Sequence, residues 1–202
     1  MTVSRRALTL LAPLALLSGL LSGLLVSSPS QATPVDRATT LAKPACQRTL
    51  ASYPILRPGD RKAAVRTLQC SLNDVGVGPV AVDGFYGPQT KAAVKEITDH
   101  FEGEAPHPYR INNGMWTLLF AGQLPNSNLA VGAHGPAVTV LQRALRAAGA
   151  TIVVDGDFGT QTERVVKAYQ REMGVHPVNG VVDSDTRFFL KMGGVFGELS
   201  RG

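Results

Sequence analysis

The strongest constraint on the fold of this chain is an internal repeat. Two sets of residues recur in the same order and with the same types, the first 73 positions further on and the second 72 positions further on. The first set is Val65, Leu68, Gln69, Leu72 and Gly76, which recurs as Val138, Leu141, Gln142, Leu145 and Gly149. The second set is Asp83, Gly84, Gly87, Thr90 and Val94, which recurs as Asp155, Gly156, Gly159, Thr162 and Val166. Such a repeat indicates two homologous modules.

Each copy of the repeat begins with apolar residues at helical spacing. Val65, Leu68 and Leu72 fall on one helical face, and their counterparts in the second copy fall on the same face. Gly76 and Gly149 are placed to end these two helices in the left-handed conformation. The sequence therefore predicts the first helix of each module, the face that it turns to the core, and the residue at which it ends.

Two more helices are expected in each module. Pro88 suits the first turn of the second helix in module one, whereas Thr160 and Glu163 have the spacing of a capping box in module two. The third helix is short, and it is expected over residues 115–120 and again over 184–190. The predicted fold class is therefore all-α, with two tandem three-helix bundles.

The third helix of module two has a predicted cap and a predicted inner face. Asp183 precedes it and can cap its first turn. Phe188, Phe189 and Leu190 are expected to point inward.

The repeat and its flanks divide the chain into six predicted parts. They are an export signal (1–32), an N-terminal arm (33–52), module one (53–122), a linker (123–128), module two (129–193) and a C-terminal tail (194–202). Because the linker is short, we expect the modules to lie side by side.

The first 32 residues have the pattern of an export signal. A basic start is followed by an apolar run, and Ser30-Gln31-Ala32 has the small-x-small form that precedes cleavage. The apolar run is also near the ~20 residues that span a bilayer, so a membrane anchor is the alternative. Its position and processing site favour export, by either the general or the twin-arginine route, with no membrane association after cleavage.

The two cysteines, Cys46 and Cys70, lie in the part of the chain predicted to be exported. In an oxidising compartment such a pair most simply forms a disulfide. The chain-entropy model assigns a bridge of this loop length roughly 3.5 kcal/mol of stabilisation. A catalytic thiol would need one cysteine that is not in a disulfide. Nothing in the sequence indicates that either cysteine is left free.

Charge and motifs argue against several functional classes. The formal charge is +5, and two of the positive charges, Arg5 and Arg6, belong to the export signal. The positive charge that remains is too small for a protein that coats nucleic acid. The four histidines form no His-Glu-x-x-His pattern, and no Gly-x-Ser-x-Gly motif occurs. Asp83 and Asp155 stand in Asp-Gly pairs typical of turns rather than of acid-base catalysis. We therefore expect no metal, no cofactor and no catalytic residue.

Module two resembles a known family over nearly its whole length. The resemblance rests on Gly135-x-Ala137-Val138-x-x-Leu141-Gln142, on Asp155-Gly156-x-Phe158-Gly159-x-x-Thr162, and on Tyr169-Gln170 followed by Gly180-x-Val182-Asp183. These motifs resemble the peptidoglycan-binding domain found beside bacterial wall hydrolases. Module one resembles it over its first two thirds.

The last third of module one departs from the family pattern. Ile97-Thr98 replaces the aromatic-glutamine pair there, and Trp116 stands where module two has Arg187. The resemblance therefore implies wall binding more strongly for module two, and we expect module two alone to bind and module one alone to bind less.

The resemblance and the residue chemistry together give a set of candidate binding residues. They are Gln142, Arg143, Asp155, Phe158 and Thr162 in module two, with Gln69 and Tyr86 in module one. The aromatic rings either stack on sugars or belong to the core, and the glutamines either bond the glycine turn or face a ligand. These alternatives stay open at the level of the sequence.

The function expected from the sequence is secreted, non-catalytic binding of peptidoglycan, through glycan or stem peptide. The alternative is an interaction protein that docks onto an exported cell-wall hydrolase. An enzyme with wall-lytic activity of its own would need a site that the motifs do not provide.

Overall fold

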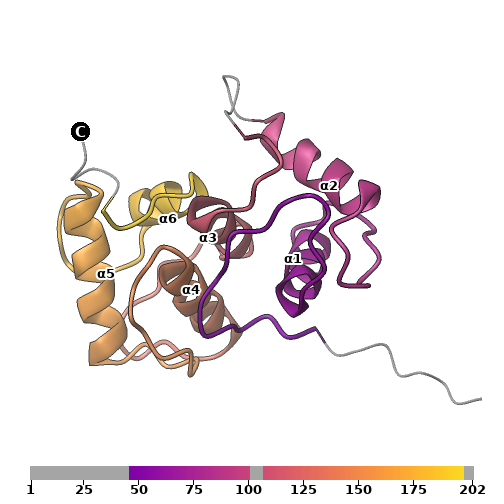
Figure 1. Ribbon diagram of the computed structural model, residues 1–202. Coiled ribbons are helices and arrows are strands. Elements are labelled where there is room, and N and C mark those ends of the chain that lie inside the picture. Colours follow the sequence, from indigo (N-terminus) through magenta and orange to yellow (C-terminus); the bar gives the residue numbers. More distant parts are fainter. Residues whose placement is uncertain (1–45, 101–106, 198–202) are drawn as a thin grey trace, which may run out of the picture. The chain divides into compact units, whose positions relative to one another are not determined.

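The computed structural model describes residues 46–100 and 107–197 (Figure 1). The predicted export signal (1–32), most of the arm and the end of the tail lie outside the described residues.

Six α-helices make up the regular structure of the described residues, three in each module (Figure 1). They are α1 (Ala63–Asp74), α2 (Pro88–Thr98), α3 (Asn113–Ala121), α4 (Pro136–Ala147), α5 (Thr160–Glu172) and α6 (Ser184–Lys191). The β-structure in these ranges is limited to isolated bridges, such as those joining Leu56 to Ile111 and Leu129 to Val182. The predicted all-α fold with two three-helix units is confirmed.

The glycine ends of the first helices are also confirmed. Gly76 has a φ of 82° and Gly149 a φ of 107°, both in the left-handed region. The next residue then donates its N–H back to the last turn, from Val77 to the oxygen of Leu72 at 3.0 Å in module one. This arrangement satisfies carbonyls that the helix leaves unpaired.

The predicted capping box of α5 is wrong. Gly159 is the N-cap residue and Thr160 is already the first residue of the helix, so its hydroxyl is not placed to cap. Glu163 instead pairs with Lys167 one turn later, at 2.7 Å. The predicted cap of α6 is confirmed, since the Thr186 N–H donates to the Asp183 carboxylate at 2.9 Å.

The inner face of α6 differs in part from the prediction. Leu190 is fully buried and Phe189 is half-buried, but Phe188 is 58% exposed. A helix this short presents one face to the core, and that face is taken by Thr186 and Leu190, which lie one turn apart. Phe188 therefore falls on the opposite side.

The two modules pack against each other through α3 and α4. A single hydrophobic cluster includes Trp116 and Phe120 of α3 as well as Leu141 and Leu145 of α4. The expectation that the modules lie side by side is therefore met. Because the modules share a core, tests of function use the whole chain.

The described part of the arm, residues 46–52, connects the modules a second time. Cys46 forms a disulfide with Cys70 of α1, as predicted, with 5.9 Å between the Cα atoms. On the other side, Arg143 of α4 donates from Nε to the Thr49 hydroxyl at 2.8 Å, and Arg146 donates to the Leu50 carbonyl at 2.9 Å. The arm is thus covalently tied to α1 and hydrogen-bonded to α4.

Candidate functional site

The repeated glutamines hold the Asp-Gly turns. In module two the Gln142 Oε1 accepts from the Gly156 N–H at 2.8 Å, while its Nε2 donates to the Asp155 carboxylate at 2.7 Å. The same Nε2 lies 3.2 Å from the Thr162 hydroxyl and 3.0 Å from the Asp157 carbonyl. We call this unit, a buried glutamine with an Asx-Gly turn and a threonine, a glutamine clamp.

Module one has the same clamp. Gln69 accepts from the Gly84 N–H at 2.9 Å and donates to Asp83 at 2.7 Å and to Thr90 at 3.1 Å. Both glutamine side chains are almost fully buried. Of the two roles that the sequence left open, the structure shows the one that bonds the turn.

A third clamp lies between α5 and α6, and it was not predicted from the sequence. Gln170 accepts from the Gly180 N–H at 2.9 Å and donates to the Thr186 hydroxyl at 3.1 Å and to Asn179 at 3.3 Å. One signal could have revealed it, because in all three clamps the threonine follows the Asx of the turn by seven positions.

The clamps explain where most of the predicted binding residues lie. Phe158, Thr162 and Tyr86 are each no more than 2% exposed, like Gln69 and Gln142. The Tyr86 hydroxyl donates to the Tyr109 carbonyl at 2.8 Å, and burial raises the pKa of that phenol. These side chains are buried inside the modules. Only Arg143 and Asp155 therefore remain as candidates for direct ligand contact.

The clamp aspartates are stable anions in this structure. The pKa of Asp155 is lowered, first because the Asp157 N–H donates to its carboxylate and next because Gln142 does. The pKa of Asp83 is lowered in the same way by the Phe85 N–H and by Gln69. A general acid needs a raised pKa, so these two carboxylates have the opposite electrostatic setting.

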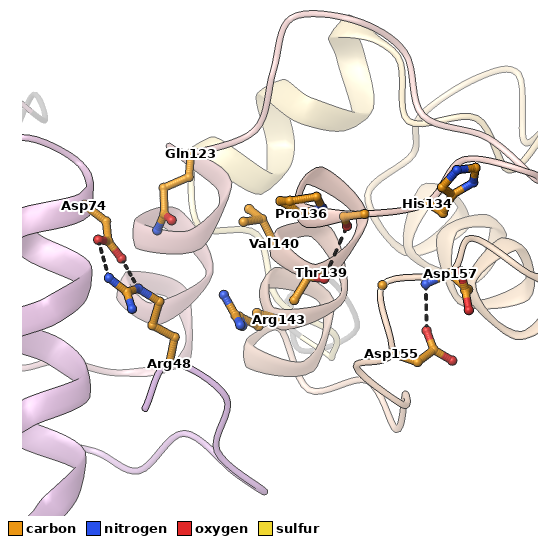
Figure 2. Close-up of a pocket in the computed structure, with 12 residues that line it drawn as sticks. Arg48, Asp74, Gln123, His134, Pro136, Thr139, Val140, Arg143, Asp155 and Asp157 are labelled. Carbon is orange, nitrogen blue, oxygen red and sulfur yellow. Dashed lines mark hydrogen bonds and ion pairs between the residues drawn. The ribbon is translucent and has the colours of Figure 1, made fainter. Parts of the chain in front are cut away.

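Arg143 and Asp155 both line an open pocket of about 890 Å³ (Figure 2). One wall comes from the start of α4 and the Asp-Gly turn of module two, and the other from the arm and the end of α1. The lining residues are Arg48, Asp74, Gln123, His134, Gly135, Pro136, Thr139, Val140, Arg143, Asp155, Gly156 and Asp157.

The charged side chains of this pocket lie one after another from one side of it to the other. At one end Arg48 binds Asp74 through two hydrogen bonds of 2.5 and 2.8 Å. Figure 2 shows Arg143 between that ion pair and the carboxylates of Asp155 and Asp157. The pocket thus offers a cation near its middle and anions at one side.

Comparison with protein families matches residues 61–99 and 134–190 to the putative peptidoglycan binding domain. The two matches are consistent with two copies of this domain, and the resemblance seen in the sequence is confirmed. This family connects the chain with the bacterial cell wall. No curated protein and no solved structure matches the chain. Arg48 and Gln123, which line the pocket, lie outside both matched segments.

Among the described residues, no helix combines the length and apolar character that crossing a bilayer would require. Within the same ranges, His, Cys, Asp and Glu side chains form no group of three or more able to hold a metal ion.

Proposed function

We propose that the protein is a secreted, non-catalytic binder of cell-wall peptidoglycan, and that the pocket between its modules is the binding site. The observation that carries the proposal is the position of this pocket. It opens where two copies of a peptidoglycan-binding domain meet, and it contains the two predicted binding residues that remain accessible, Arg143 and Asp155.

Other features agree with binding rather than catalysis. The clamp aspartates serve as turn-holding anions, and both cysteines are joined in the disulfide. A disulfide also suits an oxidising compartment outside the cytoplasm, which agrees with the export signal predicted over residues 1–32.

The test is co-sedimentation of the whole mature chain with purified insoluble peptidoglycan. Two exposed prolines begin helices, Pro136 of α4 inside the pocket and Pro88 of α2 outside it. We expect P136W to obstruct the pocket and reduce retention, whereas P88W makes the same change elsewhere and leaves retention unchanged. A wild-type chain that stays in the supernatant would contradict the proposal.

The alternative function is docking onto an exported cell-wall hydrolase, and one observation favours it. Module one carries an apolar hollow of about 340 Å³ lined in part by Val77, Ile97 and Leu118. Ile97 belongs to the third of module one that departs from the family pattern. A stoichiometric hydrolase that co-purifies with the chain, without retention on purified wall, would support this alternative.

A further inference from the structure

We propose that the pocket between the modules binds the stem peptide of peptidoglycan, with a free carboxylate of the peptide held by Arg143 and its ammonium group held by Asp155 and Asp157. The inference rests on the proposed function and goes beyond it by naming the part of the wall that is recognised.

The composition of the pocket favours a charged peptide over a glycan. Sugar-binding sites commonly stack an aromatic face against a sugar ring. None of the twelve described residues that line this pocket is Phe, Tyr or Trp, whereas arginine and aspartate supply five of them. Glycan strands of the wall are largely uncharged, and the free carboxylates and ammonium groups lie on the peptides. The pocket therefore complements the peptide.

Arg143 is oriented to receive a carboxylate. Its Nε donates to the Thr49 hydroxyl at 2.8 Å, which fixes the plane of the guanidinium group. In the part of the chain that the structure describes, Nη1 and Nη2 of Arg143 have no hydrogen-bond partner. A guanidinium group with free donors binds carboxylates through parallel hydrogen bonds, so a carboxylate is a suitable partner for this face of Arg143.

The acidic side chain of Asp74 does not satisfy Arg143. Both carboxylate oxygens of Asp74 are taken by Arg48, at 2.5 and 2.8 Å. Removal from water lowers the pKa of Arg143, and the positive charge of Arg48 also lowers it, while Tyr53 and Asp74 oppose the change. An added anion would relieve this unfavourable environment.

A short peptide can span the length of α4 between its first residue, next to the Asp-Gly turn, and Arg143. The Asp-Gly turn is tied to the start of α4, since the Gly135 N–H donates to the Gly156 carbonyl at 2.8 Å. Arg143 comes seven residues after Pro136 along α4, a rise of about 10 Å. An extended peptide covers that length with about three residues. The Asp157 carboxylate is exposed and has no hydrogen-bond or ion-pair partner among the described residues, so it can accept an ammonium group.

The test measures binding of soluble fragments to the whole mature, oxidised protein by isothermal titration calorimetry. The probes are a synthetic stem peptide with free carboxylates and a diamino acid, the same peptide with every carboxylate amidated, and peptide-free glycan oligomers. We expect the free-acid peptide to bind. The amidated peptide should bind at least about tenfold more weakly, because a charged hydrogen-bond pair is lost. We expect no binding of the glycan oligomers.

A matched pair of variants tests the residue. R143Q removes the guanidinium group from the pocket and should weaken binding of the free-acid peptide about tenfold. R164Q makes the same change on the exposed face of α5, outside the pocket, and should leave affinity unchanged. Thermal unfolding of both variants checks that they are folded, and amide shifts of Gly135 and Gly156 in the wild-type protein locate the peptide without any substitution.

Several results would overturn the inference. They are equal affinity for the free and amidated peptides, unchanged affinity in R143Q, or binding of the peptide-free glycan in place of the peptide. Co-sedimentation with whole peptidoglycan, run on the same samples, separates the two levels of the proposal. Retention on the wall without peptide binding rejects the stem-peptide inference alone, and loss of retention rejects the proposed function as well.

Discussion

The two modules share a fold but differ in how their last third is stabilised. Module two uses a second clamp there, in which the buried Gln170 bonds Gly180 and Thr186. In module one Thr98 occupies the repeat position of Gln170, and Met115 that of Thr186. Module one lacks this buried polar network, so the clamp between the second and third helices is not the only way to stabilise this helix arrangement.

Module one has an aromatic cluster in the same region. The ring of Tyr53 lies 5.3 Å from that of Trp116 and 4.9 Å from that of Phe120, between centroids. Trp116 also donates from Nε1 to the Pro54 carbonyl at 2.9 Å. Burial of large rings thus accompanies the loss of the polar clamp, since each ring removes much apolar surface from water.

One hydrogen bond survives the change of residue type. Arg187 stands at the repeat position of Trp116, and its Nη1 donates to the Ser127 carbonyl at 3.0 Å. Ser127 is the counterpart of Pro54, so both modules place a long side-chain donor on the same carbonyl. This carbonyl therefore accepts a hydrogen bond in both modules, and the donor is aromatic in one and charged in the other.

The largest expected effect comes from exchanging these two donors. W116R would bury a cation among the rings of Tyr53 and Phe120, and should lower the free energy of unfolding by about 4 kcal/mol. R187W should cost less, because Arg187 lies beside polar partners at the linker. Urea-induced unfolding of the whole chain measures both. Equal losses would show that the two environments are interchangeable.

The second prediction concerns a position at which the modules hold the same arm by different chemistry. Cys70 of α1 and Arg143 of α4 are repeat counterparts, and one holds the arm by a disulfide while the other does so by a hydrogen bond. Replacing Cys46 and Cys70 together by serine should lower the free energy of unfolding by about 3.5 kcal/mol. R143Q should cost only about 1 kcal/mol. A small loss in the double serine variant would show that hydrogen bonds alone hold the arm.

The third prediction gives module two the residue of module one. Q170T should remove the partners of the Gly180 N–H and of Thr186 without supplying the aromatic cluster, so the free energy of unfolding should fall by about 2 to 3 kcal/mol. Q161T changes a glutamine at an exposed position of the same helix and serves as the control. If Q170T matched the wild-type stability, the second clamp would be dispensable in module two as well.

The helices could be predicted from the sequence because their causes are local. The apolar spacing gave the first helices, and the glycines gave their ends. The disulfide followed from there being only two cysteines. Phe188 was placed wrongly because a short helix leaves open which of its faces meets the core, and that depends on the rest of the module.

The candidate site was less predictable for two physical reasons. A residue that recurs in both modules can be retained for the fold or for a ligand, and the repeated Gln, Asp and Thr form clamps within the fold. The pocket, in contrast, depends on where module two lies against the arm and α1. No local pattern encodes that placement, so Arg48 and Asp74 were missed.

The smallest expected effect concerns the caps of the third helices, where the modules differ by one titratable group. Asn112 caps α3 and Asp183 caps α6, each accepting an N–H at 2.9 Å. Burial raises the pKa of Asp183, but hydrogen bonds from Thr186 outweigh it, so the pKa lies below its ordinary value. A group with a lowered pKa stabilises the fold fully above its unfolded-state pKa, and that contribution is lost as the pH falls through its folded-state pKa.

D183N therefore gives module two the cap of module one. Near neutral pH the amide oxygen can still accept the Thr186 N–H, so the free energy of unfolding should change little. Below about pH 4 the variant should lose less stability than the wild type, because it has one carboxylate fewer to protonate. Urea unfolding between neutral and strongly acidic pH measures this difference. Parallel pH curves for the two proteins would mean that the Asp183 cap contributes no charge-dependent stability and that the two caps act alike at every pH.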